Sequence, residues 1–279
     1  MPFNSLRCSG AWQQHPFNET GLPACLQRSW SIGSTLHLSG LTTVYYWNKD
    51  NFEGLLALAQ SFDAQADLKP LASYCRYREQ GLRREAFAAL EQFLVASRSF
   101  DSATARRAAI EILEANSRTS QAHQFLTQPL TARFLLPTLG AWMEEDAEAA
   151  LPVRWLGLLN RDPALLRRAL SMCPDDLPVR KVLIDFALGW ADHATHHLDE
   201  SVFLGSVDEA TSAVDLARSY IAKAPDPEAL AHLTREVEYF DRLITDWKAY
   251  SENPTGDFPE WCAERERNYN YPAKFYYER

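Results

Sequence analysis

Residues 226–254 read DPEALAHLTREVEYFDRLITDWKAYSENP, and this stretch has the most regular apolar spacing in the chain. Its large apolar side chains follow one another at steps of three or four residues: Leu230, Leu233, Val237, Phe240, Ile244 and Trp247. This spacing places them on one face of a helix. Asp226 supplies a capping carboxylate directly before Pro227, and Asn253-Pro254 cannot continue a helix. The stretch therefore predicts a helix with a continuous apolar face, which needs a partner helix.

Helical signals continue towards the N-terminus as far as residue 51. Asp162-Pro163 and Asp176-Leu177-Pro178 repeat the pairing of a capping residue with a proline in the first turn. Asp101-Ser102 predicts a helix that extends to about Asn116, and Gly81 predicts a stop between a helix over 67–80 and one that starts near Leu82. The periodicity is helical almost without a break, so the sequence predicts an all-α fold.

Two junctions between these helices resemble a known family. Residues 170–180 read LSMCPDDLPVR and residues 224–230 read APDPEAL. Both are similar to the junctions of tetratricopeptide-type repeats, in which a helix closes on a proline and the next unit opens with an acidic cap. The prolines of the two junctions, Pro174 and Pro225, are 51 residues apart. The resemblance implies an irregular, solenoid-like stack of antiparallel helix pairs that binds a protein or peptide on a groove surface.

The sequence suggests three segments. Residues 1–50 are broken by prolines and glycines and predict an irregular segment packed on the helical body, with a short hairpin over residues 35–47 as one interpretation. Residues 51–253 predict a single elongated helical-repeat-like domain. Residues 254–279 form a tail whose end is rich in aromatic side chains, and burial of these rings predicts that the tail packs on the body.

Composition excludes several classes of protein. The 279 residues include 28 Lys+Arg against 37 Asp+Glu, a formal charge of −9, and the pI is near 5.3. An acidic chain without basic runs lacks the positive field that phosphate contacts need, so nucleic-acid binding is not expected. No signal-like start and no long apolar segment is present, which predicts a cytoplasmic protein without a membrane span.

Cysteine usage and motif searches point away from catalysis. The cysteines are scattered and odd in number, which predicts that most are small buried thiols rather than parts of disulfides or a zinc knuckle: Cys8, Cys25, Cys75, Cys173 and Cys262. The chain has no Gly-x-Ser-x-Gly elbow, phosphate loop or dinucleotide fingerprint. We therefore expect a non-catalytic protein without a cofactor.

A histidine cluster provides the alternative. Residues 192–200 read DHATHHLDE, with His193, His196 and His197 at what should be the end of a helix that begins near Pro178. If that helix continues, His193, His197 and Glu200 share one face and can hold Zn²⁺ or another divalent ion. This interpretation makes the chain a metal-binding protein or a metal-dependent enzyme. The structural interpretation is that these histidines cap the last helical carbonyls or bond within the core.

The surroundings of the histidines are strongly acidic. No Lys or Arg occurs from Val182 to Asp215, whereas this stretch contains seven carboxylates: Asp185, Asp192, Asp199, Glu200, Asp208, Glu209 and Asp215. A stretch of one sign focuses negative potential, although arginines from elsewhere in the chain can neutralise it. We expect the first six of these residues, with Trp190 as an aromatic anchor, to line a solvent-facing hollow that binds a basic protein. An inhibitor of the immunity-protein type would suit this pattern.

Overall fold

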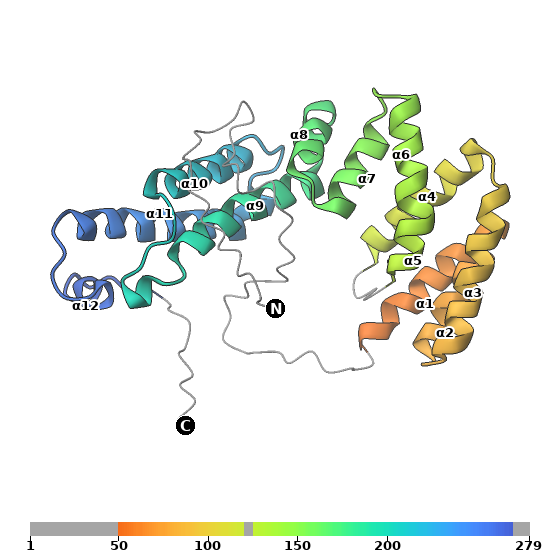
Figure 1. Cartoon of the computed structure of the whole chain (residues 1–279), viewed down its shortest axis with the longest axis horizontal. Helices are drawn as coiled ribbons and strands as arrows, with labels where there is room; N and C mark the ends of the chain where they lie inside the picture. Colours follow the sequence, from red (N-terminus) through yellow and green to blue (C-terminus); the bar gives the residue numbers. More distant parts are fainter. Residues whose placement is uncertain (1–49, 120–124, 270–279) are drawn as a thin grey trace, which may run out of the picture. The chain divides into compact units, whose positions relative to one another are not determined.

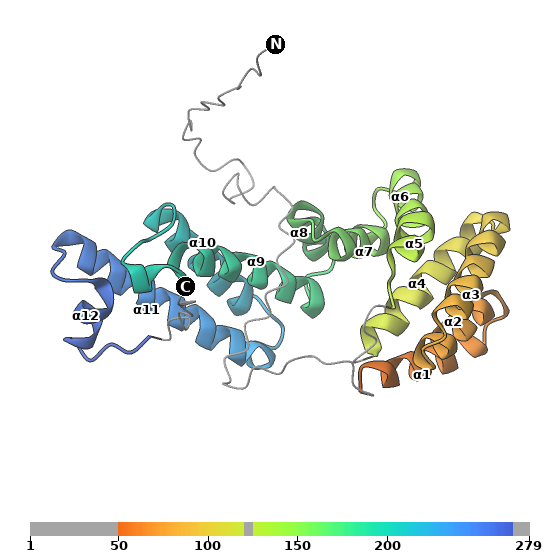
Figure 2. The ribbon, with the colours of Figure 1, turned by 60° about the horizontal axis from the view of Figure 1, so that its bottom comes forward.

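The computed structural model describes residues 50–119 and 125–269, with side chains from Gly54 onward. Every regular element in these ranges is helical, and they contain no strand. The predicted all-α fold is therefore confirmed, and the helices pack in adjacent pairs along the chain (Figures 1 and 2). The predicted hairpin over residues 35–47 lies outside the described residues.

The described residues divide into two compact units at the junction between Cys173 and Pro174. We call residues 50–173 the first unit and residues 174–269 the second unit. The sequence predicted one elongated domain over 51–253; within the described residues, each side of Pro174 buries an apolar core of its own. The junction residues Pro174, Asp175 and Asp176 separate the end of one helix at Met172 from the start of the next at Leu177.

The first unit is a succession of short helices. Its elements are α1 (Asp50–Asp63), η2 (Ala66–Leu68), α2 (Lys69–Glu79), α3 (Arg83–Ala96), η3 (Ser97–Ser99), α4 (Ser102–Arg118), α5 (Gln128–Leu130), the π-helical turn η4 (Thr131–Leu135), α6 (Leu136–Glu145), α7 (Ala150–Asn160) and α8 (Pro163–Met172). Gly81, at a φ of +75°, makes the predicted stop between α2 and α3. Asp101 caps α4 by accepting a hydrogen bond from the Thr104 N–H.

Aromatic rings hold the core of the first unit together. Phe62 of α1, Tyr74 of α2 and Phe125 before α5 are fully buried, with ring centroids 5.6 Å apart for the two phenylalanines and 6.3 Å apart for Tyr74 and Phe125. Phe93 of α3 meets Phe134 of η4 edge to face at 4.9 Å. These contacts join helices that are distant in sequence, and edge-to-face pairs add stability beyond the area that they bury.

The second unit contains the longest helices of the described chain. Its elements are α9 (Leu177–Thr195), η5 (Leu198–Glu200), α10 (Val207–Ala222), η6 (Glu228–Leu230), α11 (Ala231–Glu252) and α12 (Phe258–Ala263). Asp176 caps α9 by accepting from the Val179 N–H, and Asp226 accepts from the N–H groups of Glu228 and Ala229 at the start of η6. The start of α9 falls where its cap predicted it, whereas Asp226 caps a short 3-10 turn and α11 begins after that turn, at Ala231.

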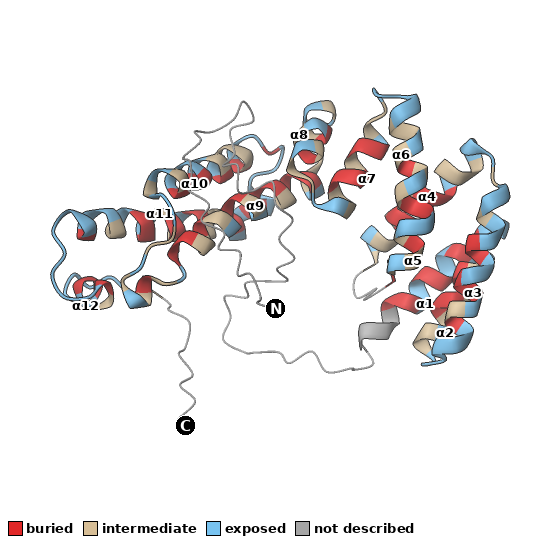
Figure 3. Ribbon diagram, viewed as in Figure 1, coloured by how far each residue is buried: buried red, intermediate tan, exposed pale blue. Residues whose placement is uncertain are grey.

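The apolar face of residues 226–254 lies in the core of the second unit. Leu233, Val237, Phe240 and Ile244 are buried, and α11 packs against both α9 and α10, so the predicted partner is a pair of helices. Figure 3 shows buried residues on the sides of α9, α10 and α11 that face one another. Trp247 is only half-buried, and its ring stacks on Phe203 with centroids 5.8 Å apart.

The C-terminal tail begins later than the sequence suggested. Phe258, Trp261 and Cys262 of α12 are buried in the second core, so the helical body extends past residue 253. The Tyr269 ring meets Tyr239 edge to face at 5.8 Å, and its hydroxyl donates a hydrogen bond to Asp246. The aromatic residues from Asn270 onward lie outside the described residues.

Candidate functional site

The histidine and acidic stretches fold into an antiparallel helical hairpin in the second unit. At one end, the Arg180 guanidinium near the start of α9 donates to the Tyr220 carbonyl near the end of α10 at 2.9 Å. At the other end, the Leu204 N–H donates to the Ala194 carbonyl at 2.9 Å, which ties the connecting loop to the last turn of α9. We call the end that carries residues 192–209 the closed end and the opposite end the open end (Figure 1).

Charge is segregated along this hairpin. The basic residues Arg180, Lys181, Arg218 and Lys223 belong to the first turns of α9 and the last turns of α10, at the open end. Five carboxylates are carried by the last turn of α9, by η5 and by the first turn of α10, at the closed end: Asp192, Asp199, Glu200, Asp208 and Glu209. We call these five residues the acidic end. Because antiparallel pairing brings the two stretches together, charges up to 17 positions apart in sequence gather at one end of the hairpin.

Helix α12 adds two carboxylates that the sequence did not suggest. The Phe258 N–H donates to the Ser201 hydroxyl at 2.7 Å, and this bond anchors the start of α12 beside η5. Asp257 caps α12 by accepting from the Glu260 N–H at 2.8 Å, and both side chains are exposed. The sequence shows Asp257 only as a cap before Phe258-Pro259. The sequence around Asp257 does not indicate that it folds beside Ser201, which lies more than 50 residues earlier in the chain.

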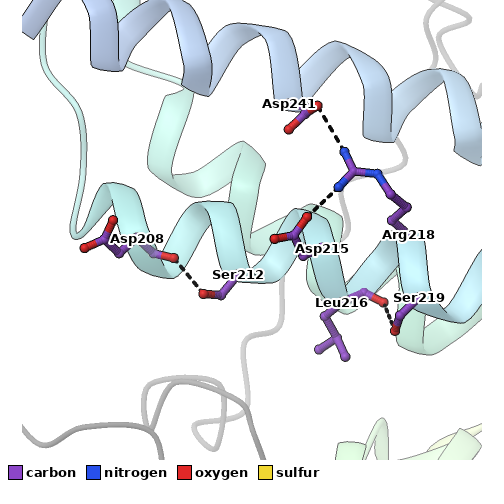
Figure 4. A network of polar contacts seen from close by, with 7 residues as sticks. All are labelled: Asp208, Ser212, Asp215, Leu216, Arg218, Ser219 and Asp241. Atoms are coloured by element: carbon purple, nitrogen blue, oxygen red, sulfur yellow. Dashed lines mark hydrogen bonds and ion pairs between the residues drawn. The ribbon is translucent and has the colours of Figure 1, made fainter.

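Two of the seven carboxylates lie elsewhere in the second unit. Asp215 is paired with Arg218, and the same guanidinium lies 3.0 Å from a carboxylate oxygen of Asp241 of α11 (Figure 4). Asp215 therefore belongs to the contact between α10 and α11. Asp185 lies about two turns before Asp192 on α9. Its charge acts on Glu236 of α11, whose pKa is raised by burial and by Asp185 against the opposing influence of His232.

Two surface depressions of the described chain lie away from the acidic end. One is lined mainly by apolar side chains of the first unit, among them Leu126, Leu136 and Leu158. The other, of about 280 Å³, lies along α11 beside Asp241, Arg242 and Arg267. The described carboxylates of the acidic end line neither of them, so the structure gathers these charges at the end of a hairpin rather than along either depression.

Trp190 is part of the packing at the closed end. Its side chain is half-buried, and its ring lies 5.7 Å from the His193 ring. The indole Nε1 is buried and has no hydrogen-bond partner among the described residues. Gly205 lies beside the same ring, since a Cβ at this position would be in ordinary van der Waals contact with it at 3.9 Å. These contacts place the indole between α9 and the loop that follows it.

The predicted common face of His193, His197 and Glu200 is not formed, because α9 ends at Thr195. The Thr195 hydroxyl donates back to the Ala191 carbonyl at 2.8 Å, and the His196 N–H makes a last helical bond to Asp192. His197 then leaves the helix with a φ of −105° and a ψ of 16°. A side-chain hydroxyl that bonds to its own helix in the last turn competes with continuation of that helix.

His193 and His196 have structural contacts. The His193 ring lies between Trp190 and His196, 5.5 Å from the latter, and burial lowers its pKa. His196 Nδ1 lies 2.8 Å from the His193 carbonyl oxygen, a hydrogen bond in which the ring nitrogen donates. This is the capping contact that the structural interpretation expected. Burial also raises the pKa of Asp192, against the opposing influence of His196 and His193.

His197 instead meets two carboxylates of the following turn. Its Nδ1 lies 3.9 Å from a carboxylate oxygen of Glu200. One ligand atom each from His197, Asp199 and Glu200 lie within 4.8 Å of one another. The structure therefore joins two members of the predicted metal-ligand set, and Asp199 takes the third place that the sequence gave to His193.

The described cysteines differ in burial. Cys75 and Cys262 are buried, as the sequence predicted for most cysteines, while Cys173 is exposed. Burial raises the pKa of Cys75 to about 12, against the opposing charges of Arg76 and Arg78, so this thiol is protonated at neutral pH.

No protein-family model, curated protein or solved structure matches this chain. Among the described helices, none combines the length and the apolar character needed to cross a bilayer.

Proposed function

We propose that this chain is a non-catalytic binding protein whose acidic end binds a basic segment of a protein partner. The observation that carries the proposal is the charge segregation along the α9–α10 hairpin. Asp192, Asp199, Glu200, Asp208 and Glu209 lie at one end, and the basic residues of the same two helices lie at the other. Charges of one sign that are grouped in this way focus the field and speed the encounter with a partner of opposite charge.

The elements that carry these carboxylates are anchored. Leu198, at the centre of the turn after α9, and Phe258, at the start of α12, are fully buried, and Ala210 is buried beneath the first turn of α10. The backbone of the acidic end is therefore ordered before a partner arrives, which lowers the entropic cost of binding. An inhibitor that covers a basic surface of another protein would use such a preformed acidic end.

The test neutralises the exposed Asp208 and the partly exposed Glu209 and compares them with a matched pair of carboxylates. Full-length protein is used as bait in its native source, and a captured partner is identified and purified. The double variant Asp208→Asn/Glu209→Gln should weaken binding by about 2- to 30-fold, because each exposed ion pair contributes about 0.2–1 kcal/mol. The control Glu144→Gln/Glu148→Gln removes the same charge from exposed positions of the first unit and should bind like the parent.

The salt dependence of binding provides a further test. Binding of the purified partner should weaken as salt rises, because salt screens exposed charges. All measurements are made in the presence of a chelator, so that metal binding does not contribute. A partner that is not basic, or one that binds the acidic-end variant and the control variant equally well, would contradict the proposal.

A further inference from the structure

The turn after α9 is closed tightly on itself. The His197 carbonyl accepts hydrogen bonds from the Glu200 N–H at 3.0 Å and from the Val202 N–H at 3.1 Å. Ser201 adopts the left-handed conformation at a φ of +58°, which ends η5. The fully buried Leu198 side chain anchors the turn in the core. These constraints fix the backbone of His197, Asp199 and Glu200 in one short loop.

The side chains of these three residues converge, with one possible ligand atom from each within 4.8 Å of the other two. His197 Nδ1 and the nearest Glu200 oxygen are 3.9 Å apart, which is longer than a hydrogen bond. Around a tetrahedral ion with bonds of about 2.0–2.2 Å, neighbouring ligand atoms lie about 3.4 Å apart. The three atoms, now within 4.8 Å of one another, need to move by about 1 Å to reach that spacing.

This movement is available to the side chains. The side chains of His197 and Glu200 are 45% and 52% exposed, so they can change rotamer without disturbing the core. The buried part of the loop is Leu198, which does not take part in the convergence. A metal ion can therefore draw the ligand atoms together while the backbone stays in place.

We infer that His197, Asp199 and Glu200 form a divalent transition-metal site at the closed end of the hairpin. An imidazole nitrogen with two carboxylate oxygens suits Zn²⁺ and related ions, whereas Mg²⁺ and Ca²⁺ prefer oxygen ligands alone. The two carboxylates balance the charge of the ion, and the neighbouring Asp192, Asp208 and Glu209 strengthen the local field that attracts it. With three protein ligands, a fourth position of the ion is left for water.

The inference differs from the sequence prediction in a way that can be measured. The sequence predicted His193 as a ligand together with His197, but the His193 ring packs between Trp190 and His196. Loss of the His193 side chain should therefore leave the metal site intact. Loss of His197 should remove it.

The test titrates Zn²⁺ into the full-length chain, prepared without a histidine tag and stripped with a chelator. Calorimetry and elemental analysis should find one Zn²⁺ per chain at this site. His197→Ala and the nearly isosteric Glu200→Gln should each weaken Zn²⁺ binding by at least about tenfold. His193→Ala and His232→Ala are the matched controls and should bind Zn²⁺ like the parent. Circular dichroism confirms that each variant is folded.

A spectroscopic reading assigns the ligand atom directly. The ¹⁵N resonance of His197 Nδ1 should shift when one equivalent of Zn²⁺ is added, whereas that of His232 should not. The inference is overturned if no stoichiometric Zn²⁺ binds, if Glu200→Gln and His197→Ala bind like the parent, or if His193→Ala alone removes binding. Because partner capture is measured in chelator, failure of the metal site and failure of the proposed docking function are separate results.

Discussion

Arg180 illustrates how one buried charge holds the hairpin together. Arg180 is only 3% exposed, and its guanidinium donates hydrogen bonds to the Tyr220 carbonyl and, at 2.5 Å, to the Pro174 carbonyl. The Tyr220 carbonyl belongs to the last turn of α10, where carbonyls lack helical partners and a positive charge is favoured. Arg180 therefore acts as a C-terminal cap supplied by the neighbouring helix.

Replacement of this residue should be costly. Arg180→Met leaves two carbonyls without their donor, and we expect a loss of about 2–3 kcal/mol in the free energy of unfolding. The neighbouring Lys181→Met removes the same charge without a described hydrogen bond and should change stability by less than about 0.5 kcal/mol. Urea denaturation measures both. Equal effects of the two variants would show that charge, rather than the two hydrogen bonds, accounts for the role of Arg180.

Glu236 predicts a pH dependence. Burial raises the pKa of this carboxyl, and the charge of Asp185 raises it further against the opposing influence of His232. A raised pKa in the folded state means that stability falls as pH rises from the ordinary glutamate pKa through the folded value. Glu236→Gln should therefore raise the urea midpoint at pH 7 and have less effect at pH 4.5. A urea midpoint of Glu236→Gln below that of the parent at pH 7 would contradict this prediction.

The control for Glu236 is Glu238→Gln. Glu238 lies two positions after Glu236 in α11, is exposed, and is also a glutamate. Its replacement should leave the urea midpoint nearly unchanged at both pH values, because an exposed carboxylate remains hydrated in the folded chain.

The start of α9 shows how a single cap sets an element. Asp176 accepts a hydrogen bond from the Val179 N–H at 3.0 Å, while the adjacent Asp175 is exposed and has no described capping bond. Asp176→Ala should lower the free energy of unfolding by about 1 kcal/mol, and Asp175→Ala should have little effect. Thermal denaturation of both variants tests the assignment. A larger loss of stability for Asp175→Ala than for Asp176→Ala would show that Asp176 is not the residue that caps α9.

The end of α9 could not be read from its apolar pattern. The stripe from Val179 to Trp190 continues at helical spacing to His193 and His197, and that continuation predicted the shared metal-binding face. The helix stops at Thr195, where the hydroxyl bonds back to Ala191 and the Leu204 N–H bonds to the Ala194 carbonyl. The bond from Leu204 comes from the loop after the helix, and the apolar spacing within the helix gives no information about that loop.

At the scale of the whole molecule, the second unit requires α12. Phe258, Trp261 and Cys262 contribute to its core, and the Phe258 N–H is bonded to Ser201 of the closed end. A chain that ends at Asn253 should lose several kcal/mol of stability, because removal of one buried aromatic side chain alone costs about 3–5 kcal/mol. A chain that ends at Tyr269 keeps every described contact and should retain its melting temperature.

Limited proteolysis provides a second reading of this truncation. The chain that ends at Asn253 should be cut rapidly within residues 174–253, whereas the chain that ends at Tyr269 should be as resistant there as the full-length protein. Equal resistance of the two truncated chains would show that the second core does not need α12.

The positions of the helices follow from local chemistry and were therefore available in the sequence. Asp101, Asp162 and Asp176 satisfy free N–H groups within three residues of themselves, and Gly81 adopts its turn through its own backbone freedom. The apolar face of α11 is likewise a property of one continuous segment. The partition of the core at Pro174 and the position of Asp257 beside the acidic end depend on contacts between segments. Asp199, rather than His193, lies beside His197 because α9 ends at Thr195, and the loop residue Leu204 helps to set that end by its bond to the Ala194 carbonyl. Only the folded chain decides these, because burial and distance are set by which helices pack together.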